Sequence, residues 1–198
     1  MNFRRTGEGG LLVELPGLDE VLRLAAELRR RAPPGVTEIV PAARTVLLVG
    51  SGLDALAAEI EDWRLPPVAA GDDVPLEIAV SYDGPDLDEV CARARLTRDE
   101  LIALHTGTVL TAAFCGFAPG FAYLAGLPAR LHVPRRVTPR TRVEAGAVGL
   151  AGEFTGVYPR ASPGGWQVIG QTRLRVWDET RDPPGLLAPG ARVRFVRA

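Results

Sequence analysis

The residues that could do chemistry are concentrated between positions 105 and 172. Aromatic and arginine side chains alternate there with many glycines and prolines. Glycine lets a backbone approach a ligand closely, and proline lowers the entropy lost when a loop holds one shape. Flat aromatic rings and guanidinium groups suit a small anionic ligand. The stretch therefore indicates a rigid anion-binding pocket, although a turn-rich β domain with glycines at its corners explains the residues equally well.

His105 and Arg140 are the candidate catalytic residues of this stretch. His105 stands at the expected end of a helix, and imidazole titrates near neutral pH, which suits a general acid or base. The alternative is a histidine that caps the helix or lies in the core. Arg140 is preferred as the partner of a carboxylate or phosphate because Pro139 fixes the chain just before it. It is chosen from Arg130, Arg135, Arg136, Arg140 and Arg142, which alternatively form a solvated basic face.

Nucleophilic and metal-binding patterns are weak. Ser162 lacks the strand–turn–helix context of a nucleophile elbow, so we interpret it as a turn residue that hydrogen-bonds a ligand. Cys115 falls in an expected strand and is predicted to be buried and inert. The two cysteines and two histidines match no metal-ligand spacing, so we expect no metal site in this chain.

Composition excludes several classes of protein. The 198 residues are 46% hydrophobic and 24% charged, which is typical of a globular protein and not of a disordered or fibrous one. A net charge of −1 argues against nucleic-acid binding. No apolar run approaches the ~18 residues of a membrane helix, and no signal-peptide pattern follows Met1, so we expect a cytoplasmic protein without a membrane partner. Every basic residue is arginine, which rules out a Schiff base or a P-loop lysine.

Hydrophobic periodicity predicts an α+β domain over residues 1–80. Strands and amphipathic helices alternate in the order β-α-β-β-α-β, the split β-α-β or ferredoxin-like pattern. Ser51 is expected to start the second helix, with Asp54 at the capping-box position. The last strand, 76–82, fits two roles, since it could close this domain or open the next. The expected elements are strands 11–15, 36–40, 45–49 and 76–82 and helices 18–31 and 51–63.

Residues 81–198 are predicted to form a mainly β second domain. A helix is expected over 86–94, and Thr97 with Glu100 forms a capping box for another helix that ends near His105. Beyond that point the prolines prevent long helices, and short strands with many turns indicate a barrel or sandwich. Segments 174–177 and 192–196 alternate charged and apolar residues and are expected to be late barrel strands.

These motifs resemble a known family. The block Gly116-Phe117-Ala118-Pro119-Gly120-Phe121-Ala122-Tyr123-Leu124 is similar to the GFxPGFxYL motif of the allophanate hydrolase subunit 1 family, also called KipI or PxpB. Further matches follow in order along nearly the whole chain, at 40–42, 82–87, 139–140, 145–152, 155–159 and 162–166. The sequence departs from the family at Glu153-Phe154, where a glutamine usually precedes the Thr-Gly pair, and Phe154 lacks the amide donor and acceptor of that glutamine.

The resemblance implies both a fold and an activity. It implies an α+β ferredoxin-like first domain and a cyclophilin-like barrel. Bacterial members typically act as the B-type subunit of an ATP-dependent 5-oxoprolinase, a hydrolase that opens 5-oxo-L-proline to L-glutamate. The implied partners are the A-type subunit of that enzyme and its C-type subunit, an allophanate hydrolase subunit 2-like protein. ATP and Mg²⁺ are then expected at the level of the complex, and the isolated chain is expected to be inactive. Alternatives are an inhibitor of a sensor histidine kinase and a component of an allophanate hydrolase or urea carboxylase-type enzyme.

The same resemblance suggests roles for particular residues. Opening an unstrained lactam needs activation, which ATP supplies by phosphorylating the amide oxygen. Arg140 would bind the substrate carboxylate and His105 would move a proton. Aromatic and hydroxyl side chains of the matched segments would contact the substrate, namely Phe117, Pro119, Phe121, Tyr123, Thr155, Tyr158, Ser162 and Trp166.

Overall fold

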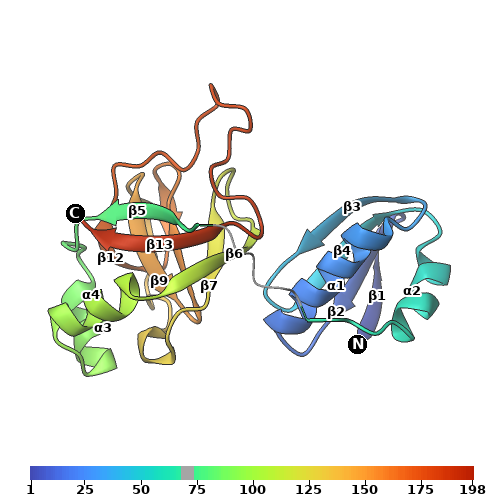
Figure 1. The fold of residues 1–198 in the computed structure, drawn as a ribbon, viewed down its shortest axis with the longest axis horizontal. Coiled ribbons are helices and arrows are strands. Elements are labelled where there is room, and N and C mark those ends of the chain that lie inside the picture. The colour runs from blue at the N-terminus through green and yellow to red at the C-terminus, as the bar shows by residue number, and fades with distance from the viewer. Residues whose placement is uncertain (68–73) are drawn as a thin grey trace. The chain divides into compact units, whose positions relative to one another are not determined.

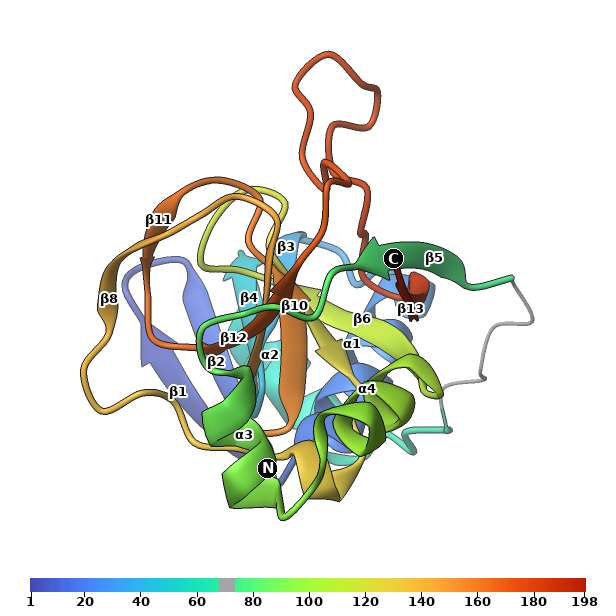
Figure 2. The same ribbon diagram turned by 90° about the vertical axis from the view of Figure 1, so that its left-hand side faces the viewer.

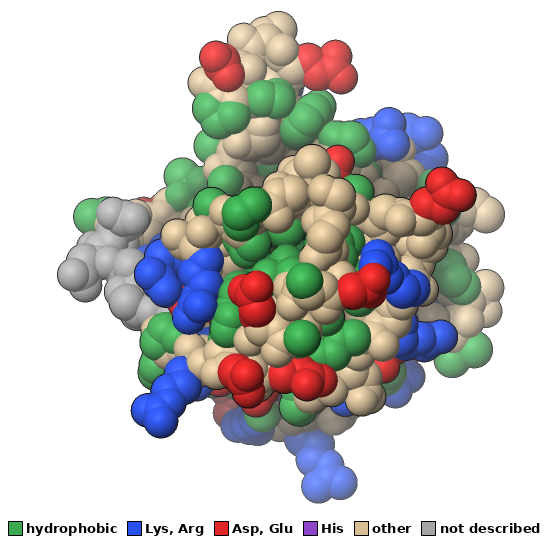
Figure 3. All heavy atoms as spheres, turned by 90° about the vertical axis from the view of Figure 1, so that its right-hand side faces the viewer, with side chains coloured by type: hydrophobic (Ala, Val, Ile, Leu, Met, Phe, Trp, Pro, Cys, Tyr) green, Lys and Arg blue, Asp and Glu red, His purple; other side chains and the backbone are tan. Residues whose placement is uncertain are grey.

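The computed structural model describes residues 1–67 and 74–198, and it divides the chain into two compact units, Met1–Ala70 and Gly71–Ala198. Figure 1 shows an α+β first unit and a mainly β second unit. Among the described residues, no helix combines the length and the apolar character needed to cross a membrane. On the face drawn in Figure 3, acidic and basic side chains are interspersed and form no patch of a single sign.

The first unit is a four-stranded antiparallel sheet with two helices. Its strands are β1 (Asn2–Thr6), β2 (Gly10–Glu14), β3 (Val36–Pro41) and β4 (Thr45–Gly50), in the order β1-β2-β4-β3. Leu11 lies opposite Leu48 and Val13 opposite Val46, so these four side chains share one face. Helices α1 (Leu18–Arg31) and α2 (Leu53–Glu61) bury their apolar stripes in the same core. The core therefore lies between one face of the sheet and both helices.

The strand order of the first unit corrects the sequence prediction. The order along the chain is β-β-α-β-β-α, because the fourth strand is β1 at the N-terminus and not the segment 76–82. Periodicity does not indicate β1, because Phe3 is the single large apolar residue of this edge strand. Ser51 does not cap α2 either. Gly52 is its N-cap, in a left-handed conformation and without a side-chain cap hydrogen bond.

The second unit contains a seven-stranded sheet that curls into a nearly closed barrel (Figures 1 and 2). The strand order is β12-β9-β10-β7-β6-β13-β5, and β5 runs parallel to β13. Its strands are β5 (Leu76–Val80), β6 (Val109–Cys115), β7 (Ala122–Ala125), β9 (Ala147–Ala151), β10 (Phe154–Val157), β12 (Gln167–Gln171) and β13 (Arg192–Arg197). The segment expected at 76–82 could either close the first domain or open the second. In the structure it opens the second unit, as strand β5.

A bridge between Ser81 and Gln171 joins the two ends of this sheet. The backbone N–H of each residue donates to the carbonyl of the other at 2.9 Å. Gly170 permits the close approach, since a Cβ atom there would lie 2.4 Å from the Ser81 carbonyl oxygen. The barrel interior is filled by buried apolar side chains, among them Ile78, Val80, Leu110, Leu124, Leu150, Ile169 and Phe195.

Shorter elements cover the barrel. Helix α3 (Leu87–Ala94) contacts β12, and α4 (Arg98–Thr106) contacts β13. The capping box of Thr97 and Glu100 is confirmed, since each side chain bonds the other residue's backbone N–H. A 3-10 turn, η1, spans Ala129–Leu131. Strands β8 (Arg140–Val143) and β11 (Ser162–Gly164) form a separate pair, visible in Figure 2.

One expected strand of the second unit is wrong. Segment 174–177 lies in the connection between β12 and β13, which extends away from the barrel (Figure 1). Only an isolated bridge, between Trp177 and Gly185, forms there. Leu174 and Val176 alternate with arginine as in a strand, but they belong to an irregular segment. Their apolar side chains pack against the barrel core, and this explains the pattern. The strand expected at 192–196 is confirmed as β13.

Candidate aromatic pocket

Seven aromatic side chains contact one another at one part of the barrel. Phe121 lies at the centre, with its ring centroid 5.2 Å from those of Tyr123 and Trp166 and 5.4 Å from that of Tyr158. All three contacts are edge-to-face, the arrangement that the ring quadrupoles favour. The full cluster is Phe114, Phe117, Phe121, Tyr123, Phe154, Tyr158 and Trp166.

A small cavity of about 50 Å³ opens beside this cluster. Its walls include five of the residues selected from the sequence, Phe117, Phe121, Tyr123, Tyr158 and Trp166. Gly164 and Gly165 complete the backbone wall, and Arg135 is the one charged residue of the lining. We call this cavity the aromatic pocket. It combines flat apolar walls with a single cation, which are the features expected of a site for a small ring-containing anion.

Phe117 forms the outer edge of the aromatic pocket in an unusual conformation. Its φ is 71°, in the left-handed region that disfavours residues with a Cβ, and its side chain is 60% exposed. Hydrogen bonds from Gly116 N–H to the Phe121 carbonyl and from Phe121 N–H to the Ala118 carbonyl hold the surrounding turn. An exposed aromatic ring in a strained backbone position is a feature that clusters at ligand sites.

Tyr158 places a hydroxyl group in the pocket wall. Gly164 makes room for it, because a Cβ at that position would lie 2.4 Å from the Tyr158 oxygen. Burial raises the pKa of Tyr158 above its usual value, although the Trp166 N–H and the charges of Arg135 and Arg140 act in the opposite direction. The hydroxyl is therefore a neutral hydrogen-bond donor at physiological pH.

Arg140 lies in a different environment from the one expected. Its guanidinium forms a two-pronged ion pair with Asp86, at 2.7 Å to one carboxylate oxygen and 2.8 Å to the other. Arg136 contacts the same carboxylate at 2.5 Å. Arg140 also lines a neighbouring cavity of about 270 Å³ with residues such as Pro85 and Val168, and it is not part of the aromatic pocket lining.

Asp86 is the buried centre of this ion-pair group. Its side chain is 2% exposed and accepts a further hydrogen bond from the Val168 backbone N–H at 2.7 Å. Burial raises the pKa of Asp86, but the Arg140 and Val168 hydrogen bonds and the charges of both arginines outweigh this effect, so its pKa lies below the usual range. The carboxylate links the start of α3, strand β12 and the segment 136–140.

His105 is a core residue rather than a pocket residue. Its side chain is fully buried, with Nδ1 2.7 Å from the Tyr82 hydroxyl and Nε2 3.1 Å from Thr155 Oγ1. Its ring stacks on Phe195 at a centroid distance of 4.5 Å. Burial lowers the pKa of His105 to about 3, so the imidazole is neutral at physiological pH. The geometry favours the core alternative that the sequence left open.

The remaining selected residues are dispersed. Thr155 is buried against His105, and Pro119 is exposed on the turn after Phe117. Ser162 belongs to β11, and its Oγ is buried with no hydrogen-bond partner among the described residues. The prediction that Cys115 is buried is wrong. It ends β6 in an exposed position and its thiol donates to the Leu187 carbonyl at 3.4 Å.

Sequence reasoning misses Asp86 and passes over Arg135. The local pattern indicates only that Asp86 begins a helix, and its arginine partners lie 50 and 54 residues further along the chain. Arg135 stands among similar arginines, and no local signal separates it from them. The fold separates Arg135 from the other arginines. Arg136 N–H donates a hydrogen bond of 2.8 Å to the Gly165 carbonyl, and this contact holds the segment 134–140 beside the pocket.

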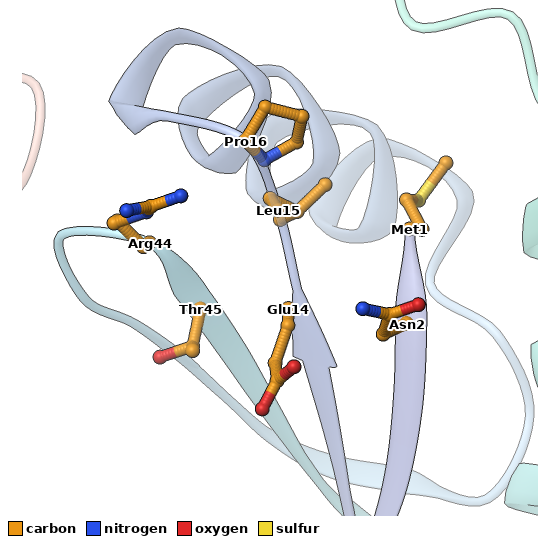
Figure 4. Close-up of a pocket in the computed structure, with 7 residues that line it drawn as sticks. All are labelled: Met1, Asn2, Glu14, Leu15, Pro16, Arg44 and Thr45. Carbon is orange, nitrogen blue, oxygen red and sulfur yellow. The ribbon is translucent and has the colours of Figure 1, made fainter.

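A larger cavity of about 450 Å³ lies in the first unit, at the ends of β1, β2 and β4 (Figure 4). Figure 4 shows Arg44 and Met1 at opposite ends of it. None of the residues selected from the sequence lines this cavity. Within residues 1–67 and 74–198, no group of three or more histidine, cysteine, aspartate or glutamate side chains is arranged to hold a metal ion.

Replacement of His105 should change the pH dependence of stability. The unfolded chain binds a proton at the histidine near pH 6.5, whereas the folded chain does not until about pH 3. The free energy of unfolding therefore decreases as the pH falls through 6.5, by about 2 kcal/mol between pH 7 and pH 5. In urea unfolding at a series of pH values, His105→Gln should show a flatter profile, and the exposed His132→Gln should serve as control. An unchanged slope in His105→Gln would contradict the assignment.

Removing the Asp86 charge should destabilise the second unit. Asp86→Asn leaves the Arg136 and Arg140 guanidinium groups, each about one quarter exposed, without their counter-charge. We expect a loss of about 3 kcal/mol in the free energy of unfolding, measured by urea denaturation.

Asp88→Asn is the matched control for this variant. Asp88 pairs with Arg98 at the surface, with both side chains more than half exposed, so its replacement should cost under ~1 kcal/mol. Equal losses in the two variants would show that the Asp86 carboxylate matters no more than a surface charge.

Arg140→Ala should also lower the free energy of unfolding in urea denaturation, because it removes two of the hydrogen bonds to Asp86.

Comparison with known proteins identifies relatives over nearly the whole chain. The family "Carboxyltransferase domain, subdomain C and D" matches residues 1–187. A protein from Escherichia coli O157:H7 that is named as the B-type subunit of 5-oxoprolinase is 40% identical over 192 residues, covering 93% of this chain and 87% of that protein. A Bacillus subtilis (strain 168) protein of the same name is 36% identical over 193 residues, covering 87% of this chain and 80% of the relative.

Structural comparison gives the same result. The crystal structure of TTHA0988 superposes with a TM-score of 0.77 at 37% identity, covering 96% of this chain and 40% of that longer chain. Urea amidolyase shares the fold at low identity: the Kluyveromyces lactis structure covers 99% of this chain with a TM-score of 0.78 at 19% identity, and the sequence of the Saccharomyces cerevisiae enzyme matches 28% of this chain and 3% of its own length at 38% identity. The chain therefore belongs to the carboxyltransferase domain, subdomain C and D family, and the relatives from E. coli and B. subtilis that match most of it are named as the B-type subunit of 5-oxoprolinase.

Proposed function

We propose that this chain is the B-type subunit of an ATP-dependent 5-oxoprolinase, acting with the A-type and C-type subunits in the cytoplasm. The complex would open the lactam of 5-oxo-L-proline to give L-glutamate while ATP is hydrolysed. The observation that carries the proposal is the aromatic pocket with its single cation, in a chain that is 40% identical to a protein of this name. The isolated chain is proposed to lack activity, because the pocket encloses too little of a ligand on its own.

The chemistry of 5-oxo-L-proline fits the lining of the aromatic pocket. The ligand is a five-membered ring with one carboxylate, one amide N–H and one amide carbonyl. The Phe121 and Tyr123 rings offer apolar walls to its methylene groups, and the Tyr158 hydroxyl offers a hydrogen bond to its carbonyl. Phe154 stands where the family usually has a glutamine, and its ring extends the aromatic wall through Tyr123 at 5.6 Å. At this position the chain therefore offers an apolar ring in place of an amide donor and acceptor.

The size of the pocket explains why partner subunits are needed. A cavity of about 50 Å³ cannot enclose a five-membered ring with its carboxylate. A ligand must therefore rest partly on the rim beside Phe117 and be covered by another polypeptide, which also excludes water from the reaction. In this proposal ATP and Mg²⁺ belong to the assembled complex. We assign the second unit to the cyclophilin-like barrels as part of the same proposal, on the basis of its nearly closed sheet.

The alternatives receive less support. An inhibitor of a sensor histidine kinase needs an exposed protein-binding patch and has no use for a concave aromatic site with a cation. A component of an allophanate hydrolase or urea carboxylase-type enzyme is less well supported by sequence, because the urea amidolyase structure that covers 99% of this chain is only 19% identical to it, whereas the E. coli relative is 40% identical over 93% of this chain. Neither alternative accounts for the aromatic pocket as well as a small anionic ring does.

Reconstitution provides the direct test of the proposed function. The chain should co-purify with the A-type and C-type subunits when the three are produced together. The complex should release ADP in proportion to added 5-oxo-L-proline and form L-glutamate in equal amount, both followed by coupled assays. Complexes lacking this chain are the control and should show no lactam-dependent ADP release. If the full complex releases ADP with urea or allophanate but not with 5-oxo-L-proline, the proposed function is wrong.

Phe117 provides a test of the site itself. Phe117→Gly relieves the left-handed backbone, so stability should stay within about 1 kcal/mol of the wild type. The same change removes the outer wall of the pocket, so the KM for 5-oxo-L-proline should rise by about tenfold. Thermal melting and steady-state kinetics of the complex measure the two effects separately.

Val137→Gly is the matched control for the Phe117 variant. Val137 is 99% exposed and is not part of the pocket lining, so its loss should leave the KM unchanged. A Phe117→Gly complex with an unaltered KM would remove this ring from the site.

A further inference from the structure

We propose that Arg135 binds the carboxylate of the substrate, in place of Arg140, and that the Tyr158 hydroxyl binds the carbonyl on the opposite side of the ring. The proposal deepens the proposed function and rests on it. Its starting point is that Arg135 is the one charged residue in the aromatic pocket lining. A contact between Arg135 and the carboxylate would let the complex distinguish 5-oxo-L-proline from a neutral lactam.

The neighbouring arginines are already engaged. Arg136 and Arg140 are both held by the buried Asp86 carboxylate. Arg142 pairs with Glu144 at 2.6 Å, and Arg130 donates to the Arg95 carbonyl at 3.2 Å. For Arg135, the described part of the chain provides no ion pair or hydrogen-bond partner. Its guanidinium is therefore available to an incoming carboxylate without first breaking another contact.

The backbone around Arg135 is fixed even though its side chain is exposed. The next residue, Arg136, donates its backbone N–H to the Gly165 carbonyl at 2.8 Å, and its side chain is tied to Asp86. On the other side, Gln167 donates its side-chain N–H to the Pro134 carbonyl at 3.3 Å. Arg135 is thus held beside Gly165 and Trp166 by contacts on both flanks. A guanidinium on an anchored backbone loses less freedom on binding than one on a loose loop.

Tyr158 supplies a second contact in the same pocket. Within the described part of the chain no acceptor takes the Tyr158 O–H proton, so the hydroxyl can donate it to a ligand in the pocket. Arg135 and Tyr158 line the same cavity, close enough for the arginine charge to act on the hydroxyl. A ring that carries a carboxylate and an amide carbonyl on separate carbons can engage both donors. A lactam without the carboxylate can engage only the hydroxyl.

Arg135→Gln in the reconstituted complex tests this inference. The variant should raise the KM for 5-oxo-L-proline by about tenfold to a hundredfold, because a charge-assisted hydrogen bond is lost. The kcat and the KM for ATP should stay within about threefold of the wild type, since the arginine holds substrate and takes no part in proton transfer. Arg130→Gln, an exposed arginine of the same segment, is the matched control and should leave all constants unchanged.

A substrate analogue separates the carboxylate contact from other effects. The wild-type complex should prefer 5-oxo-L-proline over 2-pyrrolidinone, the same lactam without a carboxylate, and Arg135→Gln should lose about tenfold or more of that preference. Arg135→Lys should recover part of it as a point charge. Tyr158→Phe should weaken the binding of both lactams alike.

The outcomes distinguish this inference from the proposed function. If the wild-type complex releases no ADP with 5-oxo-L-proline, the proposed function has failed and the inference fails with it. If the wild-type complex is active and Arg135→Gln keeps both its KM and its preference for the carboxylate, the inference alone is overturned. A melting temperature of Arg135→Gln equal to that of Arg130→Gln shows that the variant folds.

Discussion

A buried carboxylate determines how the second unit is assembled. Asp86 is almost fully shielded from water, so its charge must be compensated by groups of the protein. Arg136, Arg140 and the Val168 N–H supply that compensation. Because these partners come from distant parts of the chain, satisfying one carboxylate brings the start of α3, strand β12 and the segment 136–140 together. The same contacts engage two arginines and leave Arg135 on the neighbouring surface.

The aromatic pocket follows from this assembly. The segment that Asp86 fixes passes beside Gly165, and the Arg136 N–H bond to that glycine places Arg135 next to Trp166. Trp166 in turn packs on the rings of Phe121 and Tyr123. Two groups of contacts therefore build the site, and the segment 134–140 connects them. One is the buried ion-pair group around Asp86, and the other is the aromatic cluster, which is open at its outer edge.

Local patterns predict local structure well. The helix at 18–31 has the bounds expected from its apolar periodicity, and the Thr97 capping box forms as the sequence indicates. Pairings between distant segments are beyond such reasoning. β5 pairs with β13, more than 100 residues away, and β1 joins the first sheet although its sequence, Asn-Phe-Arg-Arg-Thr, has little apolar character. Local reasoning fails to separate Arg140 from Arg135 for the same reason, since Asp86 decides which arginine is free.

Fluorine NMR tests most directly whether a small anionic lactam occupies the aromatic pocket. The chain would carry 5-fluorotryptophan and be assembled with unlabelled partner subunits. Adding 5-oxo-L-proline should shift the resonance of Trp166, which lines the pocket, and leave that of Trp63, which lies in the first unit against Arg31, in place. If Trp166 keeps its resonance at a 5-oxo-L-proline concentration that saturates ADP release, the substrate binds elsewhere and the account is contradicted.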